Sequence, residues 1–489
     1  MIATPVMAGP ALTIAWLLLP YLAAFVAALL PGAARSLSLL CCLATGAIAT
    51  AISLGLMPDQ LELLGSWGVL LRLPATVSPF LWLAALVHAA VLLDGWRRPQ
   101  DTSQVLLLSV LHGGLAFSFV AADLISLYVA LEVVGISAFL LILLPRTARA
   151  LWIALRYLLV SNSVMTLYLI GAAIVYSQAG SFRYTALAQT DGAAAAALLL
   201  LGLFTKAGLF VSGLWLPRTH AEAPPEVSAL LSGVVVTAGV APLMQLTSLT
   251  PSLLPTVRAV GLASALLGVV YALVDHDAKR LLAWSTLSQM GLVVLSPLGG
   301  GVMALAHGLA KAALFLTARS FPSRRLEGWT GRPLAAAQWW PLWLASLSIA
   351  GLPALLGAAA KARLELELPQ AWVWGVSLAS VGTVAVYARL WGAPLAAAPA
   401  SGTTHPPSGW SAGTLLLLVP LVGGGLLTPW SWMVLAKAAL ILLAGLAVHH
   451  LLEPLRRRPP GRLPPMEQLP DLLGGMGLVG AGLLGALSR

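Results

Sequence analysis

Residues 127–142 read Leu-Tyr-Val-Ala-Leu-Glu-Val-Val-Gly-Ile-Ser-Ala-Phe-Leu-Leu-Ile, an apolar run with one carboxylate near its centre. The run belongs to a longer hydrophobic stretch, 123–144, which is long enough for a helix to cross a hydrocarbon core about 30 Å thick. A charged side chain at that depth costs roughly 2.5 to 3.5 kcal/mol, so a chain keeps one where something uses it. Lys206, Lys311 and Lys361 lie inside similar apolar stretches. Such buried charges are typical of an ion path.

The composition of the whole chain also indicates a membrane protein. Of the 489 residues, 59% are hydrophobic and only 9% are charged, and the mean hydropathy is +0.92. So few polar residues cannot cover the surface of a water-soluble globule. The apolar runs are about 18 to 25 residues long, whereas the strands of a membrane barrel are shorter and alternate. The sequence predicts an all-α, multi-pass protein of a plasma, inner or thylakoid-type cell membrane.

We expect about 14–16 transmembrane helices. The candidate spans are 11–30, 36–56, 76–94, 104–121, 123–144, 153–176, 193–216, 227–248, 256–274, 281–298, 301–318, 338–358, 370–392, 412–428, 431–450 and 470–487. The first is expected to be a membrane helix rather than a removed signal, because no basic residue precedes it. The spans 412–428 and 431–450 could instead form a broken or interfacial pair.

Basic residues lie mainly in short loops on one side of these spans, which explains the net charge of +10 without a nucleic-acid partner. They are Arg35, Arg97, Arg98, Arg146, Arg149, Arg218, Lys279, Arg280, the 319–332 loop and the run 456–458. The opposite side carries Asp59, Glu62, Arg183 and Asp191. By the positive-inside rule the basic side is cytoplasmic and both termini lie outside.

The sequence contains no Gly-rich phosphate loop, Walker motif or haem-spaced histidine pair, so we expect no cofactor, no nucleotide hydrolysis and no electron transfer in this chain. Its polar stretches are too short for a large soluble domain. The energy for any transport must therefore come from an ion gradient or from a partner. The expected surroundings are the lipid bilayer and other membrane subunits.

Proline and small residues accompany both Lys206 and Lys361, which favours broken helices. Transporters often carry such breaks in corresponding helices of two inverted repeats, where freed backbone groups line a hydrated cavity. Glu132 needs a counter-charge, and Lys206 is its natural partner. A pair of this kind can act as a proton switch, because the carboxylate holds the lysine protonated. The alternative is a purely structural ion pair.

Four motifs then identify a family. Residues 215–233 read Trp-Leu-Pro-Arg-Thr-His-Ala-Glu-Ala-Pro-Pro-Glu-Val-Ser-Ala-Leu-Leu-Ser-Gly. This stretch closely resembles the antiporter-like membrane subunits shared by Mrp-type cation/proton antiporters, respiratory complex I and related hydrogenases. Three further stretches resemble motifs of that family in the same order: 277–291, 307–315 (His-Gly-Leu-Ala-Lys-Ala-Ala-Leu-Phe) and 350–361 (Ala-Gly-Leu-Pro-Ala-Leu-Leu-Gly-Ala-Ala-Ala-Lys). The spacing is most similar to the D subunit of Mrp or the equivalent complex I subunit.

The resemblance implies two inverted five-helix repeats joined by a central polar axis. The expected divisions are N-terminal helices 1–103, a first repeat 104–250, a second repeat 251–395, and C-terminal helices with a basic linker 396–489. The implied proton path comprises Glu132, Lys206, His307, Lys311 and Lys361. His307 and Lys311 are four residues apart and so share one helix face. A secondary polar path is implied for Thr205, Thr237, His220 and Lys279, although any of these groups could simply be a satisfied packing residue.

The chain also departs from the family pattern. Thr237 occupies the place of a bridging lysine, and a hydroxyl can pass hydrogen bonds but cannot store a proton charge. The other departures are Leu131, Arg156, the stretch 211–213 and Arg218. These losses cluster in the first half, whereas Lys311 and Lys361 of the second half remain. Either an altered path uses Thr205, Ser212, Thr237 and water, or the chain has drifted toward a structural or regulatory role.

The leading hypothesis is a proton-translocating, antiporter-like subunit of a multi-subunit membrane complex, with a Mrp-type Na⁺/H⁺ antiporter as the first choice. A second hypothesis is a proton-pumping membrane subunit of an NADH or ferredoxin:quinone oxidoreductase, or of a hydrogenase. In that case the chain would be a translocase subunit without its own redox site. A non-translocating scaffold of such a complex and a stand-alone secondary transporter are two further hypotheses. The transported ions would be protons and, in the antiporter, Na⁺.

Overall fold

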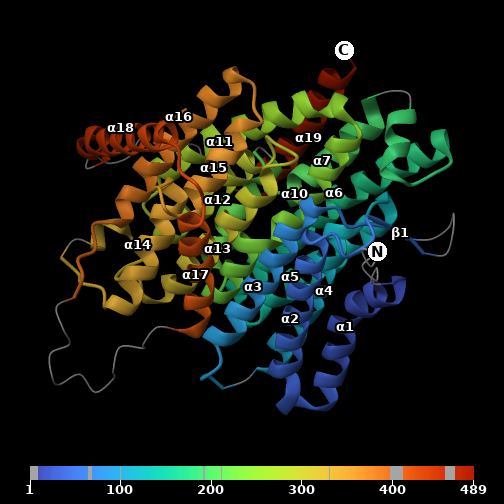
Figure 1. Cartoon of the computed structure of the whole chain (residues 1–489), viewed down its shortest axis with the longest axis horizontal. Helices are drawn as coiled ribbons and strands as arrows, with labels where there is room; N and C mark the ends of the chain where they lie inside the picture. The colour runs from blue at the N-terminus through green and yellow to red at the C-terminus, as the bar shows by residue number, and fades with distance from the viewer. Residues whose placement is uncertain are drawn as a thin grey trace, which may run out of the picture.

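The computed structural model of the chain describes residues 9–63, 69–99, 101–190, 193–210, 212–329, 331–396, 411–456 and 468–488 (Figure 1). Asp191, Arg457 and Arg458 of the orientation argument lie outside these residues, as does most of the linker that follows Glu453. Helices make up nearly all of the described chain. A two-stranded antiparallel sheet joins β1 (Gln60–Glu62) to β2 (Leu70–Arg72), with Leu61 opposite Leu71.

The described residues form a succession of α-helices. They are α1 (Pro10–Leu29), α2 (Ala34–Ser53), α3 (Ser78–Asp94), α4 (Thr102–Val120), α5 (Leu124–Leu143), α6 (Ala148–Ala179), α7 (Ala193–Lys206), α8 (Trp215–Glu222), α9 (Pro225–Leu230), α10 (Thr237–Leu249), α11 (Leu254–Val274), α12 (Ala278–Val293), α13 (Gly300–Thr317), α14 (Ala336–Ala350), α15 (Leu356–Leu366), α16 (Gln370–Tyr387), α17 (Ala412–Leu426), α18 (Trp432–Arg456) and α19 (Leu469–Leu487). A π-helical turn, η6 (Leu231–Val235), connects α9 to α10. A 3₁₀ turn, η5 (Ser212–Leu214), precedes α8, and another, η8 (Ala318–Ser320), follows α13.

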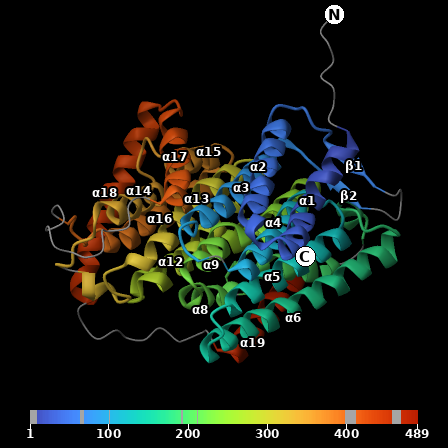
Figure 2. The same cartoon turned by 90° about the horizontal axis from the view of Figure 1, so that it is seen from below.

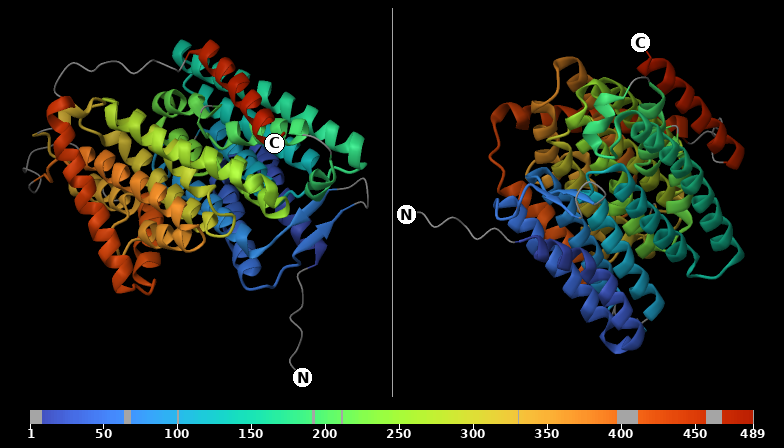
Figure 3. Two further views of the ribbon diagram at one scale, coloured as in Figure 1. Left: turned by 90° about the horizontal axis from the view of Figure 1, so that it is seen from above. Right: turned by 90° about the vertical axis from the view of Figure 1, so that its right-hand side faces the viewer.

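Within the described residues, 12 helical segments are long and apolar enough to cross a membrane, and α7 and α17 are shorter apolar helices. The right-hand view of Figure 3 shows most of them running side by side in one direction. The prediction of an all-helical, multi-pass membrane protein is therefore confirmed. The interior is predominantly apolar, and most of its buried polar residues are serines and threonines, so the buried lysines Lys206, Lys311 and Lys361 stand out.

The spans predicted at 193–216 and 338–358 are divided in the structure. The first span is divided into α7, η5 and α8. The second is divided into α14 and α15, and five residues separate these two helices. Gly208 (φ +69°) and Gly351 (φ +96°) take left-handed conformations at the two breaks, and Ala354 (φ +68°) does so without being glycine. Each break falls in the fourth member of a set of five consecutive spans, α4 to α10 and α11 to α16. The broken helices near Lys206 and Lys361 are thus confirmed.

The two C-terminal helices pack at distant places. Helix α18 lies on α16, whereas α19 lies on α7 and α6. Figures 1 and 2 show α18 near α14 and α16 at one end of the molecule, while α1 lies toward the opposite end. Helix α18 is largely exposed along its length, and Lys437 ties it to Glu365 of α15 through a 2.7 Å ion pair.

The basic loops predicted for one side of the membrane do lie together. Arg319 binds both Asp94 (3.1 Å) and Glu226 (2.6 Å), and Arg324 binds Glu222 (2.9 Å). A separate ion pair, Arg183 with Glu62 (2.5 Å), joins residues predicted for the opposite side. The contacts within each group support the predicted division of charges between two faces.

Helices α11 and α12 approach closely because small residues line their contact. A Cβ added to Gly291 would collide with the backbone of Gly261 and Ala265, and a Cβ on Gly268 would collide with Ser288. Close backbone approach through small residues is a usual way to pair helices in a bilayer, where apolar side chains gain little by leaving lipid. This pairing fixes the start of the second set of helices.

We expect Gly291→Leu to lower the thermal unfolding temperature of the detergent-purified chain, because the new side chain has no space between α11 and α12. The destabilisation should be at least about 2 kcal/mol. Gly477→Leu on α19 is the matched control, since its Cβ would meet nothing within 4 Å. Equal melting temperatures for the two variants would contradict the close packing.

Candidate functional site

Lys206 is the last residue of α7, and its side chain is buried. Its ammonium donates to the Ser161 hydroxyl (2.6 Å) and to the Leu131 carbonyl (3.2 Å). Gly135 leaves room for this contact, because a Cβ there would lie 3.1 Å from the Lys206 Nζ. The side chain thus crosses from the broken helix to the backbone of α5, one residue before Glu132.

Glu132 lies beside this ammonium without binding it. Among the described residues, no ion pair or hydrogen bond joins Glu132 to Lys206, and the buried Oε1 atom of Glu132 has no hydrogen-bond partner. The expected pairing is therefore not formed, because Ser161 and a carbonyl satisfy the lysine first. Glu132 is only half-buried, on a side of α5 where Val129 and Ile136 are exposed. A carboxylate at the apolar surface of a helix needs a polar neighbour.

The secondary residues near Lys206 are also tied to backbone. Thr205 donates to the Leu201 carbonyl (2.8 Å), and Thr237 donates to the Val234 carbonyl (2.6 Å). A small cavity of about 10 Å³ adjoins Lys206 and Thr205 and extends to Val235. That volume is about the least that holds one water molecule. The Thr237 hydroxyl thus donates back to the π-helical turn before α10, and Thr237 does not line this cavity.

Lys311 occupies the centre of the molecule and is fully buried on α13. Its ammonium donates to the Leu282 carbonyl of α12 at 2.5 Å, and it lies 5.4 Å from the centre of the Tyr387 ring, a cation–π distance. The Tyr387 hydroxyl in turn bonds Ser285 (2.9 Å). Sequence reasoning missed Tyr387 and Ser285, although a lone tyrosine in an apolar span signals a hydroxyl that must find a partner.

A chain of hydroxyl groups connects the first set of helices to Lys311. Ser232 of the π-helical turn bonds Thr286 (2.6 Å), and Thr286 donates to the Leu282 carbonyl (3.1 Å), which also accepts from Lys311. Either hydroxyl can be the donor in the bond between Ser232 and Thr286. Neither residue was singled out from the sequence.

His307 of the predicted proton path and His220 of the secondary polar path are both buried in this region. His220 of α8 lies between the rings of Trp215 (5.9 Å) and Phe315 (6.2 Å). His307 lies one turn before Lys311 on α13, where Gly308 packs closely against Gly233 of the π-helical turn. The structure therefore brings His220, His307 and Lys311 together around α13, while Lys206 and Glu132 form a separate group.

Lys361 sits just after the second break and is buried on α15. Its ammonium donates to the carbonyls of Ile349 (2.8 Å) and Ala350 (3.4 Å), the last two residues of α14. The carboxyl end of a helix carries partial negative charge and favours a cation. One turn further along α15 is Glu365, the ion-pair partner of Lys437. The break thus provides the acceptors for the third buried ammonium.

Lys279 lies at the basic face, at the start of α12. Its ammonium donates to the Ala223 carbonyl (2.6 Å), the residue that ends α8. Burial and the charge of Arg324 lower the pKa of Lys279 to about 8, although the carboxylates of Asp277 and Glu222 oppose this shift. Lys279 is therefore placed to secure the loop that follows His220 rather than to contact the buried lysines.

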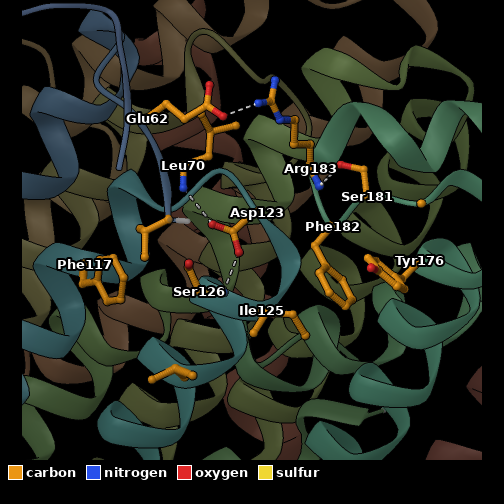
Figure 4. A pocket seen from close by; sticks show the side chains of 13 residues that line it. Glu62, Leu70, Phe117, Asp123, Ile125, Ser126, Tyr176, Ser181, Phe182 and Arg183 are labelled. Carbon is orange, nitrogen blue, oxygen red and sulfur yellow. Dashed lines mark hydrogen bonds and ion pairs between the residues drawn. The ribbon is translucent and has the colours of Figure 1, made fainter. Parts of the chain in front are cut away.

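A larger cavity, of about 480 Å³, opens near the start of α5 on the opposite face (Figure 4). Asp123 caps α5 by accepting from the Ser126 amide (2.7 Å), and its second oxygen accepts from the Leu70 amide of β2 (3.0 Å). The ion pair of Glu62 with Arg183 lies at its rim, as Figure 4 shows. Sequence reasoning missed Asp123, whose position directly before an apolar run is the usual signal of a helix cap.

These observations define a polytopic membrane protein with broken helices and charged groups in its interior. The sequence model of the family described as NADH:quinone oxidoreductase/Mrp antiporter, TM, matches residues 121–385. Because that match covers more than half of the 489-residue chain, the chain belongs to this family. The match includes α5 to α15 entirely, and so all of the predicted site residues.

Two relatives and one solved structure illustrate the similarity. The NADH-quinone oxidoreductase subunit N of Desulforudis audaxviator is 30% identical over 328 residues, which cover 60% of this chain and 64% of that protein. The D subunit of the Na⁺/H⁺ antiporter of Alkalihalophilus pseudofirmus is 29% identical over 351 residues, covering 64% and 69%. The structure of the Mrp complex from Dietzia sp. DQ12-45-1b matches with a TM-score of 0.78 at 21% identity, over 98% of this chain and 60% of that chain. The chain thus spans less than two thirds of the length of subunit N, and the structural match supports the fold.

The pKa of Lys279 predicts a pH dependence of stability. Between pH 8 and pH 10.5 the unfolded chain keeps the lysine proton while the folded chain has lost it, so folding stability gains with rising pH. Relative to Lys279→Met, the wild-type chain should gain roughly 1 to 3 kcal/mol across this window. Thermal unfolding of both proteins in detergent at pH 7.5 and pH 10 measures the difference. Parallel pH profiles would rule out a shifted Lys279.

Proposed function

We propose that the chain is a proton-translocating, antiporter-like subunit of a multi-subunit membrane complex. The observation that supports this best is shared by Lys206, Lys311 and Lys361: each ammonium is buried and held by backbone carbonyls. Among the described residues, none of the three makes an ion pair with a carboxylate. A lysine held by neutral groups can exist with or without its proton, whereas an arginine could not.

The partner complex that we propose first is a Mrp-type Na⁺/H⁺ antiporter. The similarity to the antiporter's D subunit and the fold shared with the Mrp complex support it. The half-buried Glu132 supports a neighbouring subunit, since the exposed part of its side chain would otherwise meet lipid beside Val129 and Ile136. The similarity to subunit N keeps the alternative of an NADH:quinone oxidoreductase, or a related hydrogenase, in which the redox sites belong to other chains.

In the proposed mechanism the lysines exchange protons in turn. Lys206 and Glu132 form the group of the first repeat, His307, Lys311 and His220 form the central group, and Lys361 faces the exit. Ser232 and Thr286 join the central group to the first repeat by hydrogen bonds. Two unit charges about 10 Å apart at an effective dielectric of 20 interact by about 1.7 kcal/mol, so a change at one group biases the next.

One observation favours the scaffold alternative. Thr237 stands where the bridging lysine was expected, and its hydroxyl donates to the Val234 carbonyl of the π-helical turn just before it. In the described structure, α10 has no titratable side chain that could carry a proton between Lys206 and the central group. A chain that holds the complex together without moving protons would tolerate this gap.

Lysine-to-arginine variants test transport directly. In the assembled complex reconstituted in proteoliposomes, Lys206→Arg and Lys361→Arg should each reduce proton flux at least about tenfold, because arginine keeps the charge but does not release the proton. A pH-sensitive dye inside the vesicles measures the flux, and complex assembly is measured in parallel.

Lys437→Arg is the matched control, since arginine can keep the ion pair with Glu365 at the surface of the bundle. It should retain wild-type flux. Normal flux in the Lys206→Arg and Lys361→Arg variants, with normal assembly, would reject the transport function and favour the scaffold. Loss of assembly in both would leave Lys206→Gln and Lys361→Gln, which fit the same space, to decide in the same assay.

A further inference from the structure

A second large cavity, of about 560 Å³, lies at the basic face of the molecule. It is bounded by the end of α3 and the turn that follows, by the end of α13 with η8, and by the first turns of α14 and α17. None of the buried lysines lines it. The positive-inside rule places this face at the cytoplasmic leaflet.

The charged groups around this cavity are mostly positive. Arg97, Arg98 and Arg319 line it together with a single carboxylate, Asp94. Asp94 is already shared, since it accepts from Arg98 (3.1 Å) and from Arg319 (3.1 Å). Even with Glu226, which binds Arg319 from outside the cavity, three guanidinium groups face two carboxylates.

Arg97 is the group that this network does not use. Among the residues that the structure describes, no hydrogen bond or ion pair involves Arg97, and its side chain is exposed at the cavity. The stretch 397–410, which precedes α17 and lies outside the described residues, contains no Asp or Glu that could neutralise it. The cavity therefore has uncompensated positive charge and favours an anion from outside the chain.

The remaining lining indicates which anion. Leu93, Leu316 and Leu415 give the cavity an apolar lining, and Leu415, one turn into α17, is 41% exposed. Trp96, which is 43% exposed, stands at the rim, as tryptophan often does at the membrane interface. A site with guanidinium groups and an apolar lining matches a phosphate headgroup with its acyl chains.

We propose that this cavity binds an anionic phospholipid of the cytoplasmic leaflet, with the lipid phosphate held by Arg97, Arg98 and Arg319. Its acyl chains lie along Leu415 of α17. The lipid also supports a strained part of the fold, because α17 packs against the second break, where Gly425 leaves no room for a Cβ beside Ala354 and Leu355. A lipid at the first turn of α17 thus stabilises the helix that holds the acceptors of Lys361 in place.

The test measures lipid binding by the full-length chain purified in a mild detergent. Phosphatidylglycerol should raise the melting temperature and should remain bound in native mass spectra, whereas phosphatidylcholine should do neither. Arg97→Gln should weaken phosphatidylglycerol binding about fivefold, because one arginine contact is lost. The fold is unaffected by this change, since Arg97 contributes no internal hydrogen bond or ion pair among the described residues.

Arg146→Gln is the matched control for general surface charge. Arg146 is exposed on the basic face in the turn after α5 and does not line the cavity. Phosphatidylglycerol affinity should be unchanged in this variant. Equal affinities of Arg97→Gln and the wild-type chain would overturn the proposal. Stabilisation by inorganic phosphate or glycerol 3-phosphate as strong as that by the lipid would also overturn it, because the apolar lining would then contribute nothing.

Discussion

Three ammonium groups in an apolar interior depend on backbone carbonyls, and this constraint shapes much of the bundle. Lys206 binds the Leu131 carbonyl, Lys311 binds the Leu282 carbonyl, and Lys361 binds the last two carbonyls of α14. In a bilayer, polar backbone and charged groups must be satisfied inside the protein, so acceptors for a lysine have to be built into the helices. Lys361 obtains its acceptors at a helix break, where α14 ends, whereas Lys206, although it lies at the end of α7, finds its acceptors on the intact helices α5 and α6.

Different local features make the three carbonyls reachable. At Leu131 the acceptor lies within an intact helix, and Gly135 one turn later removes the side chain that would cover it. At Leu282 the carbonyl accepts from both Thr286 and Lys311, so a hydroxyl and an ammonium share one oxygen. At Ile349 the helix simply ends, with Gly351 in a left-handed conformation. The strained φ of Ala354 in the same break shows that packing against Gly425 holds the chain there.

The sequence predicted the helices and the two breaks well, because apolar length and small residues beside lysines are local signals. It also identified the side of the molecule on which the basic loops gather. It could not predict the contacts of Lys206, since Ser161 lies 45 residues away on another helix and nothing in its neighbourhood marks it. The hydroxyl contacts of Ser232, Thr286 and Tyr387 were not predicted either, because a serine or tyrosine in a membrane span is usually a packing residue. The expected ion pair of Glu132 with Lys206 is not formed, because the Lys206 ammonium donates to the Ser161 hydroxyl and the Leu131 carbonyl instead.

These contacts also show where the hydrogen-bonded path from Lys206 to the central group is interrupted. Ser232 connects the first set of helices to the central group, whereas Thr237, five residues later, donates back to the Val234 carbonyl of the same π-helical turn. The missing link is therefore between Lys206 and Ser232, and a cavity large enough for about one water lies on the Lys206 side of it. Such a water could accept from the lysine, but Val235 and Ala238, which line the cavity from the π-helical turn and α10, have no polar side chain to continue the hydrogen-bond chain. Among the residues that the structure describes, no continuous chain of side-chain hydrogen bonds joins the two halves. The proposed proton transport therefore requires coupling through the field of the charged groups, or a movement of α7 against α10 that brings Lys206 nearer the central group.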